Sequence, residues 1–169
     1  MHDLNISYRQ MGLIIGAWQF TYMFFALPAG FILDRYGLKA SIFLAALIIT
    51  LSLISRGLSN NFYHMWLAVA LFGIGGPLIS VGVPKVSSLW KGEKSRAISM
   101  GILFTGPMFG GIFSLFTMNS LIMPLFNNNW KLVYFLYSLA PFLAGLIWLF
   151  ITKNKTVLNK KESTVLNIS

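Results

Sequence analysis

The sequence contains no cysteine and very few acidic residues. Its 169 residues include four aspartates and glutamates against 13 lysines and arginines, and its two histidines, His2 and His64, stand far apart. Without cysteine there is neither a disulfide framework nor a thiolate metal site, and two isolated histidines cannot make a metal cluster unaided. The sequence therefore predicts no metal ion and no cofactor.

Signals for secretion and for catalysis are also missing. The start, MHDLNIS, lacks the positive region, apolar core and cleavage site of a signal peptide, so the first hydrophobic stretch is expected to stay in the mature protein. No serine is placed with a histidine and an acid, and there is no HExxH pattern, no pair of intramembrane aspartates and no phosphate-binding loop. We predict that the chain is not an enzyme.

Apolar residues dominate what is present. Hydrophobic residues make up 56% of the chain and charged residues 10%, and the mean hydropathy is +0.72; an average soluble domain has about 25% charged residues. These values predict an all-α, polytopic helix bundle embedded in a lipid bilayer. The net charge of +9 lies in short loops between apolar runs rather than along one face, so no nucleic-acid partner is expected.

Charged and polar residues divide the chain into membrane spans. Uncharged runs of 24 and 16 residues lie between Arg9 and Asp34 and between Lys39 and Arg56, and a helix of about 20 residues crosses a bilayer. Five transmembrane spans are expected, at about 10–33, 40–57, 62–84, 97–122 and 132–152. They form one helix-bundle domain, residues 1–152, and the polar residues 153–169 are expected to be a flexible cytoplasmic tail.

The basic residues predict the orientation of the bundle, because lysine and arginine gather on the cytoplasmic side. One side has three, Arg9, Arg56 and Lys131, and the other has ten: Arg35, Lys39, Lys85, Lys91, Lys94, Arg96, Lys153, Lys155, Lys160 and Lys161. A multi-pass protein of a prokaryotic cytoplasmic membrane, with its carboxyl terminus in the cytoplasm, is expected. Five spans then place the amino terminus outside, which without a signal peptide suggests that a segment upstream is missing.

The stretch AGFILDRYGLKAS, residues 29–41, places charge between two apolar runs. Gly30 allows close helix approach, Gly37 allows a tight turn, Arg35 and Lys39 anchor the loop, and Asp34 can face the positive end of a helix. This stretch resembles the G-x-x-x-D-R-x-G-R-K loop between the second and third helices of major facilitator superfamily transporters, with Leu38 where a basic residue is usual. The resemblance implies that the loop helps to hold one side of the transporter shut.

A second similarity lies in GILFTGPMFGG, residues 101–111. Pro107 weakens a helical hydrogen bond, and Gly106, Gly110 and Gly111 let another helix approach. The stretch is similar to the G-x-x-x-G-P-x-x-G-G pattern of the fifth helix in the same superfamily, where it is associated with antiporters. Small residues and a proline are also common wherever membrane helices cross, so the direction of transport stays open.

The resemblance covers nearly the whole chain. The glycine-rich third span is similar to the family's fourth helix, although Val69 stands where many members carry an arginine. Within the superfamily, the sequence resembles the cyanate-permease-like branch most. The five spans would then be helices 2 to 6 of a twelve-helix transporter, that is, its amino-terminal half without the first helix, and a second chain or half would complete it.

Neutral polar residues are the candidates for a solute path, because the spans carry almost no charge. They are Gln19, Thr21, Ser80, Thr105 and Asn119, and for each of them a helix-to-helix hydrogen bond is an equally good interpretation. The resemblance implies transport of a small solute by alternating access, with a proton or sodium gradient as the energy source. A non-transporting scaffold, or an inactive remnant of a split transporter gene, is the alternative.

Overall fold

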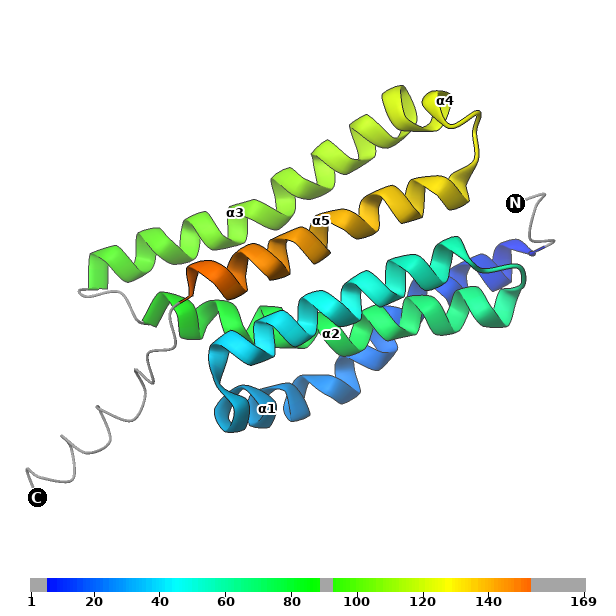
Figure 1. Ribbon diagram of the computed structural model, residues 1–169. Helices are drawn as coiled ribbons and strands as arrows, with labels where there is room; N and C mark the ends of the chain where they lie inside the picture. Colours follow the sequence, from blue (N-terminus) through cyan, green and yellow to red (C-terminus); the bar gives the residue numbers. More distant parts are fainter. Residues whose placement is uncertain (1–5, 89–92, 153–169) are drawn as a thin grey trace, which may run out of the picture.

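A computed structural model of the chain describes residues 6–88 and 93–152. Every regular element within these residues is helical, and the long helices α2, α3 and α5 run in alternate directions (Figure 1). The all-α prediction is therefore confirmed, whereas the predicted tail, 153–169, lies outside the described residues. The helices are α1 (Tyr8–Gly57), α2 (Phe62–Ser88), α3 (Glu93–Thr117), the π-helix η2 (Met118–Ile122), α4 (Met123–Leu125) and α5 (Trp130–Ile151).

Helix α1 begins at a capping box and reverses its direction at Gly37. The Ser7 hydroxyl accepts a hydrogen bond from the Gln10 backbone N–H at 3.2 Å, and the Gln10 side chain accepts one from the Ser7 N–H at 2.8 Å. Gly37 has φ 77° and ψ 165°, which no helix adopts. We call residues 8–36 the first arm and residues 38–57 the second arm; they are the blue and cyan segments that turn back on each other in Figure 1.

Four helices among the described residues are long and apolar enough to cross a membrane. They are α1, α2, the stretch Lys94–Leu125, and α5. The sequence predicts five spans because it places separate spans at 10–33 and 40–57, and both fall within α1, on either side of Gly37. The chain reverses at a glycine without an intervening loop, so the two arms form one helical element. The count of five spans, which treats the two arms as separate spans, stays a prediction.

The backbone at Gly37 makes a test of the reversal possible. We expect Gly37→Ala to destabilise the protein by about 1–3 kcal/mol, because this combination of φ and ψ is readily adopted only by glycine. A Cβ at Gly37 would meet nothing within 4 Å, so the backbone alone causes the loss. Thermal unfolding in detergent measures it, with Gly12→Ala as the control at a helical glycine that is equally open. Equal melting temperatures for the two variants would contradict the expected strain.

Small residues set the closest helix approaches. The first arm crosses α2 at Gly73, which is buried against Thr21 and the Trp18 carbonyl, and the Thr21 hydroxyl donates to the Ala70 carbonyl at 2.8 Å. The second arm meets α2 where the Ser52 hydroxyl donates to a backbone carbonyl, that of Ala68, at 2.6 Å. Helix α2 is thus held against both arms by close contact and by hydrogen bonds to backbone carbonyls. The buried apolar clusters comprise Ile14, Ala17, Met65, Val69 and Ala70, and Ala29, Leu33, Ala45 and Leu78.

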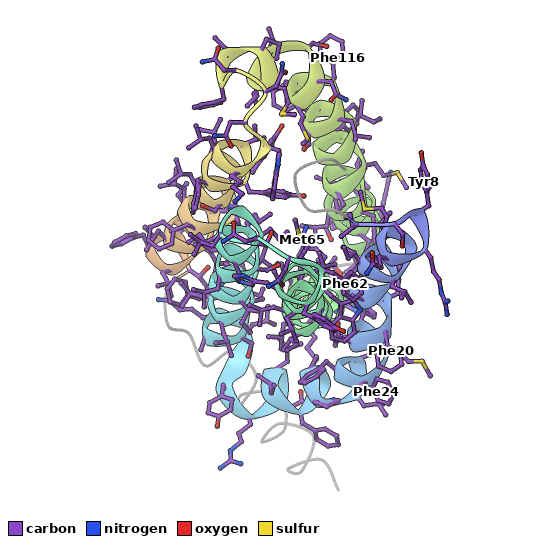
Figure 2. The ribbon with its side chains drawn as sticks, turned by 90° about the vertical axis from the view of Figure 1, so that its right-hand side faces the viewer. Tyr8, Phe20, Phe24, Phe62, Met65 and Phe116 are labelled. Atoms are coloured by element: carbon purple, nitrogen blue, oxygen red, sulfur yellow. The ribbon has the colours of Figure 1, made fainter. Side chains whose placement is uncertain are left out.

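Helix α5 packs on the second arm, whereas α3 is almost wholly exposed. A Cβ at Gly145 would lie 2.7 Å from the Ala46 Cβ, which shows how closely α5 approaches the arm. Helix α3 meets α5 through Tyr137, whose hydroxyl donates to the Ser114 carbonyl at 3.0 Å. Figure 2 shows Phe116 on α3 far from the labelled residues of α1 and α2, and its side chain is exposed. The apolar surface of α3 therefore needs lipid or another helix to cover it.

Candidate functional site

The end of the bundle that contains Gly37, here called the Gly37 end, carries an ion pair. Lys85 Nζ, near the end of α2, lies 2.5 Å from Asp34 Oδ1 in the last turn of the first arm. The side chain of Asp34 is 70% exposed and that of Lys85 is 31% exposed. The pair therefore joins two helices at the surface and leaves much of the carboxylate free to meet another group.

The predicted loop residues surround this ion pair. Asp34 and Arg35 are exposed and Gly30 and Lys39 are half-buried, while the Arg35 guanidinium lies 5.7 Å from the centroid of the Tyr36 ring. The Lys39 carbonyl accepts a hydrogen bond from the Trp148 indole N–H at 3.2 Å. Three helices thus converge on the reversal: both arms of α1, the end of α2, and α5.

At the opposite end, here called the Arg56 end, the helices line an open-sided cavity of about 360 Å³. Trp18 from the first arm, Phe72 from α2 and Tyr134 from α5 contribute aromatic rings to its wall. Arg56, at the end of the second arm, is the cationic member of the lining. The remaining lining residues are aliphatic or thioether side chains: Ile6, Met11, Ile14, Ile15, Met65 and Val69.

Arg56 lies near two aromatic rings, and no acid of the described part of the chain pairs with it. Its guanidinium carbon lies 5.6 Å from the centroid of the Phe72 ring and 6.0 Å from that of Tyr134. The Nε atom is buried and has no hydrogen-bond partner within residues 6–88 and 93–152. Buried polar atoms in proteins almost always have a partner, so this nitrogen calls for an acceptor.

The family model described as Major Facilitator Superfamily matches residues 1–166. The chain belongs to the Major Facilitator Superfamily.

Transporters are among the curated relatives of this superfamily member. It is 27% identical over 161 residues to a hexuronate transporter of Bacillus subtilis, covering 95% of this chain and 37% of that protein. It is 24% identical over 153 residues to a galacturonate transporter of Dickeya chrysanthemi, covering 90% and 43%, and 33% identical over 85 residues to an agnestins efflux protein of Paecilomyces divaricatus, covering 50% and 19%. The chain thus spans less than half the length of each of these relatives.

The predicted solute-path residues do not gather at one place in this superfamily member. The Thr21 hydroxyl is used in the crossing with α2. Ser80 donates to the Gly76 carbonyl at 3.2 Å and Thr105 to the Gly101 carbonyl at 2.5 Å, each within its own helix. Gln19 and Asn119 are exposed, on α1 and η2. Thr21 therefore makes a helix-to-helix hydrogen bond, as one of its two interpretations predicted. None of the five residues lines the cavity.

The glycine–proline motif lies in the open on α3. A Cβ added at Gly106, Gly110 or Gly111 would meet nothing within 4 Å, and Pro107 is exposed beside them. No helix of the described chain approaches these glycines. The close packing that the motif predicts would have to come from a partner outside residues 6–88 and 93–152.

Two residues that matter in the structure were missed by sequence reasoning. Lys85 and Arg56 were both counted as loop charges that set the orientation. Helix α2 continues past Pro84 to Ser88, which brings Lys85 to Asp34, and the second arm continues through Arg56 to Gly57. The sequence did contain a signal for Arg56, because tyrosine and tryptophan residues lie next to the loops at this end. Arginine packs well on aromatic rings, so an aromatic environment for Arg56 could have been predicted.

Proposed function

We propose that this chain moves a small solute across a membrane by alternating access, as part of a major facilitator transporter driven by a proton or sodium gradient. Membership of the superfamily carries this proposal. The apolar helices, and relatives named for the transport of hexuronate and galacturonate, support it. They favour a sugar acid as the solute.

The two arms of α1, α2, the α3–α4 stretch and α5 would make five spans that correspond to helices 2 to 6 of the superfamily fold. The excess of basic residues at the Gly37 end supports a cytoplasmic position for that end and for the carboxyl terminus, in a bacterial cytoplasmic membrane. The chain covers 37% and 43% of two transporters that it resembles. A further half, in the same or a second polypeptide, would complete the transport path.

The Gly37 end would act as the gate. Asp34 keeps an exposed carboxylate although it pairs with Lys85, so it can also meet the positive amino end of a helix from the other half. Gly30, Arg35, Gly37 and Lys39 would set the shape and charge of this contact. The open glycine face of α3 at Gly106, Gly110 and Gly111 would be a second contact between helices, and Gln19, which is exposed and is the largest of the uncharged polar residues predicted for the solute path, would meet the solute.

Solute flux tests this function. The 169-residue chain alone is compared in proteoliposomes with a version joined to the neighbouring coding sequence, using radiolabelled galacturonate and an imposed proton or sodium gradient. We expect flux from the completed version only, because alternating access requires two halves around a central site. Flux from the chain alone would show that copies of it form a path. Absence of flux from both, with correct insertion, would favour a scaffold or an inactive remnant.

A further inference from the structure

We propose that Arg56 and the cavity at the Arg56 end form a binding site for the carboxylate of a small organic acid. The cavity of about 360 Å³ is lined by three aromatic residues, by aliphatic side chains and by this single cation. Small-molecule sites are typically concave, largely apolar and about 300–1,000 Å³ in volume, with a few polar groups that orient the ligand. The inference rests on the proposed transport function and names the chemistry of the solute.

Among the residues that the structure describes, no acid lies near Arg56 to neutralise its charge. Residues 6–88 and 93–152 contain two acidic positions, Asp34 and Glu93. Asp34 pairs with Lys85 at the Gly37 end, and the second arm places about 30 Å of helix between that end and Arg56. Glu93 begins α3, and α3 starts at the Gly37 end (Figure 1). An anion at the cavity would therefore meet Arg56 without competition from either of these acids.

The geometry around Arg56 favours a planar oxyanion with an apolar body. The guanidinium lies 5.6 Å from the centroid of the Phe72 ring and 6.0 Å from that of the Tyr134 ring, and these contacts limit its freedom. The buried Nε has no acceptor among the described residues, and arginine presents paired N–H donors that fit a carboxylate bidentately. Trp18, on the facing arm, offers a ring against which the apolar face of a sugar ring can stack.

Tryptophan fluorescence of the chain in lipid nanodiscs measures this binding, because Trp18 lines the cavity. Galacturonate and galactose are the probes, since they share a ring and differ in the carboxylate. We expect galacturonate to bind the wild type more tightly than galactose, and Arg56→Gln to weaken galacturonate binding about 10- to 100-fold while galactose binding changes little. Arg56→Lys keeps the charge without the paired donors, so it should retain only part of the preference.

Arg9→Gln is the matched control, because Arg9 is also an arginine of α1 near this end but is exposed and lies outside the cavity lining. It should leave the preference for the acid unchanged. Equal binding of the two sugars to the wild type, or an acid preference that survives Arg56→Gln, would overturn the site.

Anionic lipid is the other source of an oxyanion, and it is tested by repeating the titration in nanodiscs with and without phosphatidylglycerol. Fluorescence that follows this lipid through Arg56, with no response to galacturonate, would overturn the solute site. The experiments can contradict the binding site and the proposed transport function independently. Acid binding through Arg56 without any flux from the completed protein would overturn transport alone, whereas galacturonate flux that Arg56→Gln leaves unchanged would overturn the site alone.

Discussion

Gly73→Ala is expected to destabilise the bundle by about 3 kcal/mol, at the upper end of the usual cost of overpacking. An added Cβ would overlap the Thr21 side chain and the Trp18 carbonyl oxygen. The carbonyl belongs to a helical backbone, so the whole first arm would have to move away from α2. That shift would also break the hydrogen bond from Thr21 to the Ala70 carbonyl. The yield of folded protein and its melting temperature in mild detergent measure the effect.

Gly76→Ala is the matched control on the same helix. There the nearest atom to an added Cβ belongs to the flexible Tyr22 side chain, at 3.4 Å, so we expect a melting temperature close to that of the wild type. Adding Thr21→Ala to Gly73→Ala should restore stability only in part, because the overlap with the Trp18 carbonyl remains. If Gly73→Ala has the same melting temperature as the wild type, the first arm and α2 do not cross at this glycine.

The second large effect is expected from Asp34→Asn in a completed transporter. Uptake should fall about tenfold, which is a typical size for the coupling between two conformational states, because the variant removes the exposed charge that the gate would use. Melting temperature and membrane insertion should stay the same, since an exposed ion pair contributes about 1 kcal/mol at most. Initial uptake rates, normalised to the amount of inserted protein, provide the measurement.

A double-mutant cycle with Lys85 separates the two tasks of this aspartate. If Asp34 acts mainly on the other half of the transporter, Lys85→Gln should reduce uptake less than Asp34→Asn does, and the double variant should behave like Asp34→Asn alone. If the pair itself closes the gate, the two single variants should be equally slow and the exchanged pair, Asp34→Lys with Lys85→Asp, should recover uptake. Normal uptake by Asp34→Asn would remove the loop from the mechanism.

Hydropathy and charge were enough to predict the helical class and the reversal near Gly37. A long apolar run interrupted by DRYG leaves few other solutions, because each backbone polar group in a bilayer must be bonded within a helix. The position of the reversal follows from the tolerance of glycine for positive φ. The joining of the two predicted spans into α1 could not be foreseen, since it depends on how many residues stay helical on each side of the glycine.

The site residues were harder to predict, because their partners are distant in the sequence. Arg56 is 78 residues from Tyr134, the difference between their numbers, and only the packing of α5 on the second arm brings them together. Thr21 was read as a solute contact or a helix contact, and the choice depended on the position of the Ala70 carbonyl. Sequence patterns specify which residues are buried, whereas pairs between helices depend on rotation and depth, which the patterns do not encode.

The reversal at Gly37 is fixed from two directions. Lys85 attaches it to α2 through Asp34, and Trp148 attaches it to α5 through the Lys39 carbonyl. A push applied to this tip by a neighbouring protein half would therefore be shared at once among both arms, α2 and α5, instead of bending one hairpin. These helices would then move as one rigid body. A small displacement of the Gly37 end would tilt them together and move the Arg56 end on the far side of the membrane.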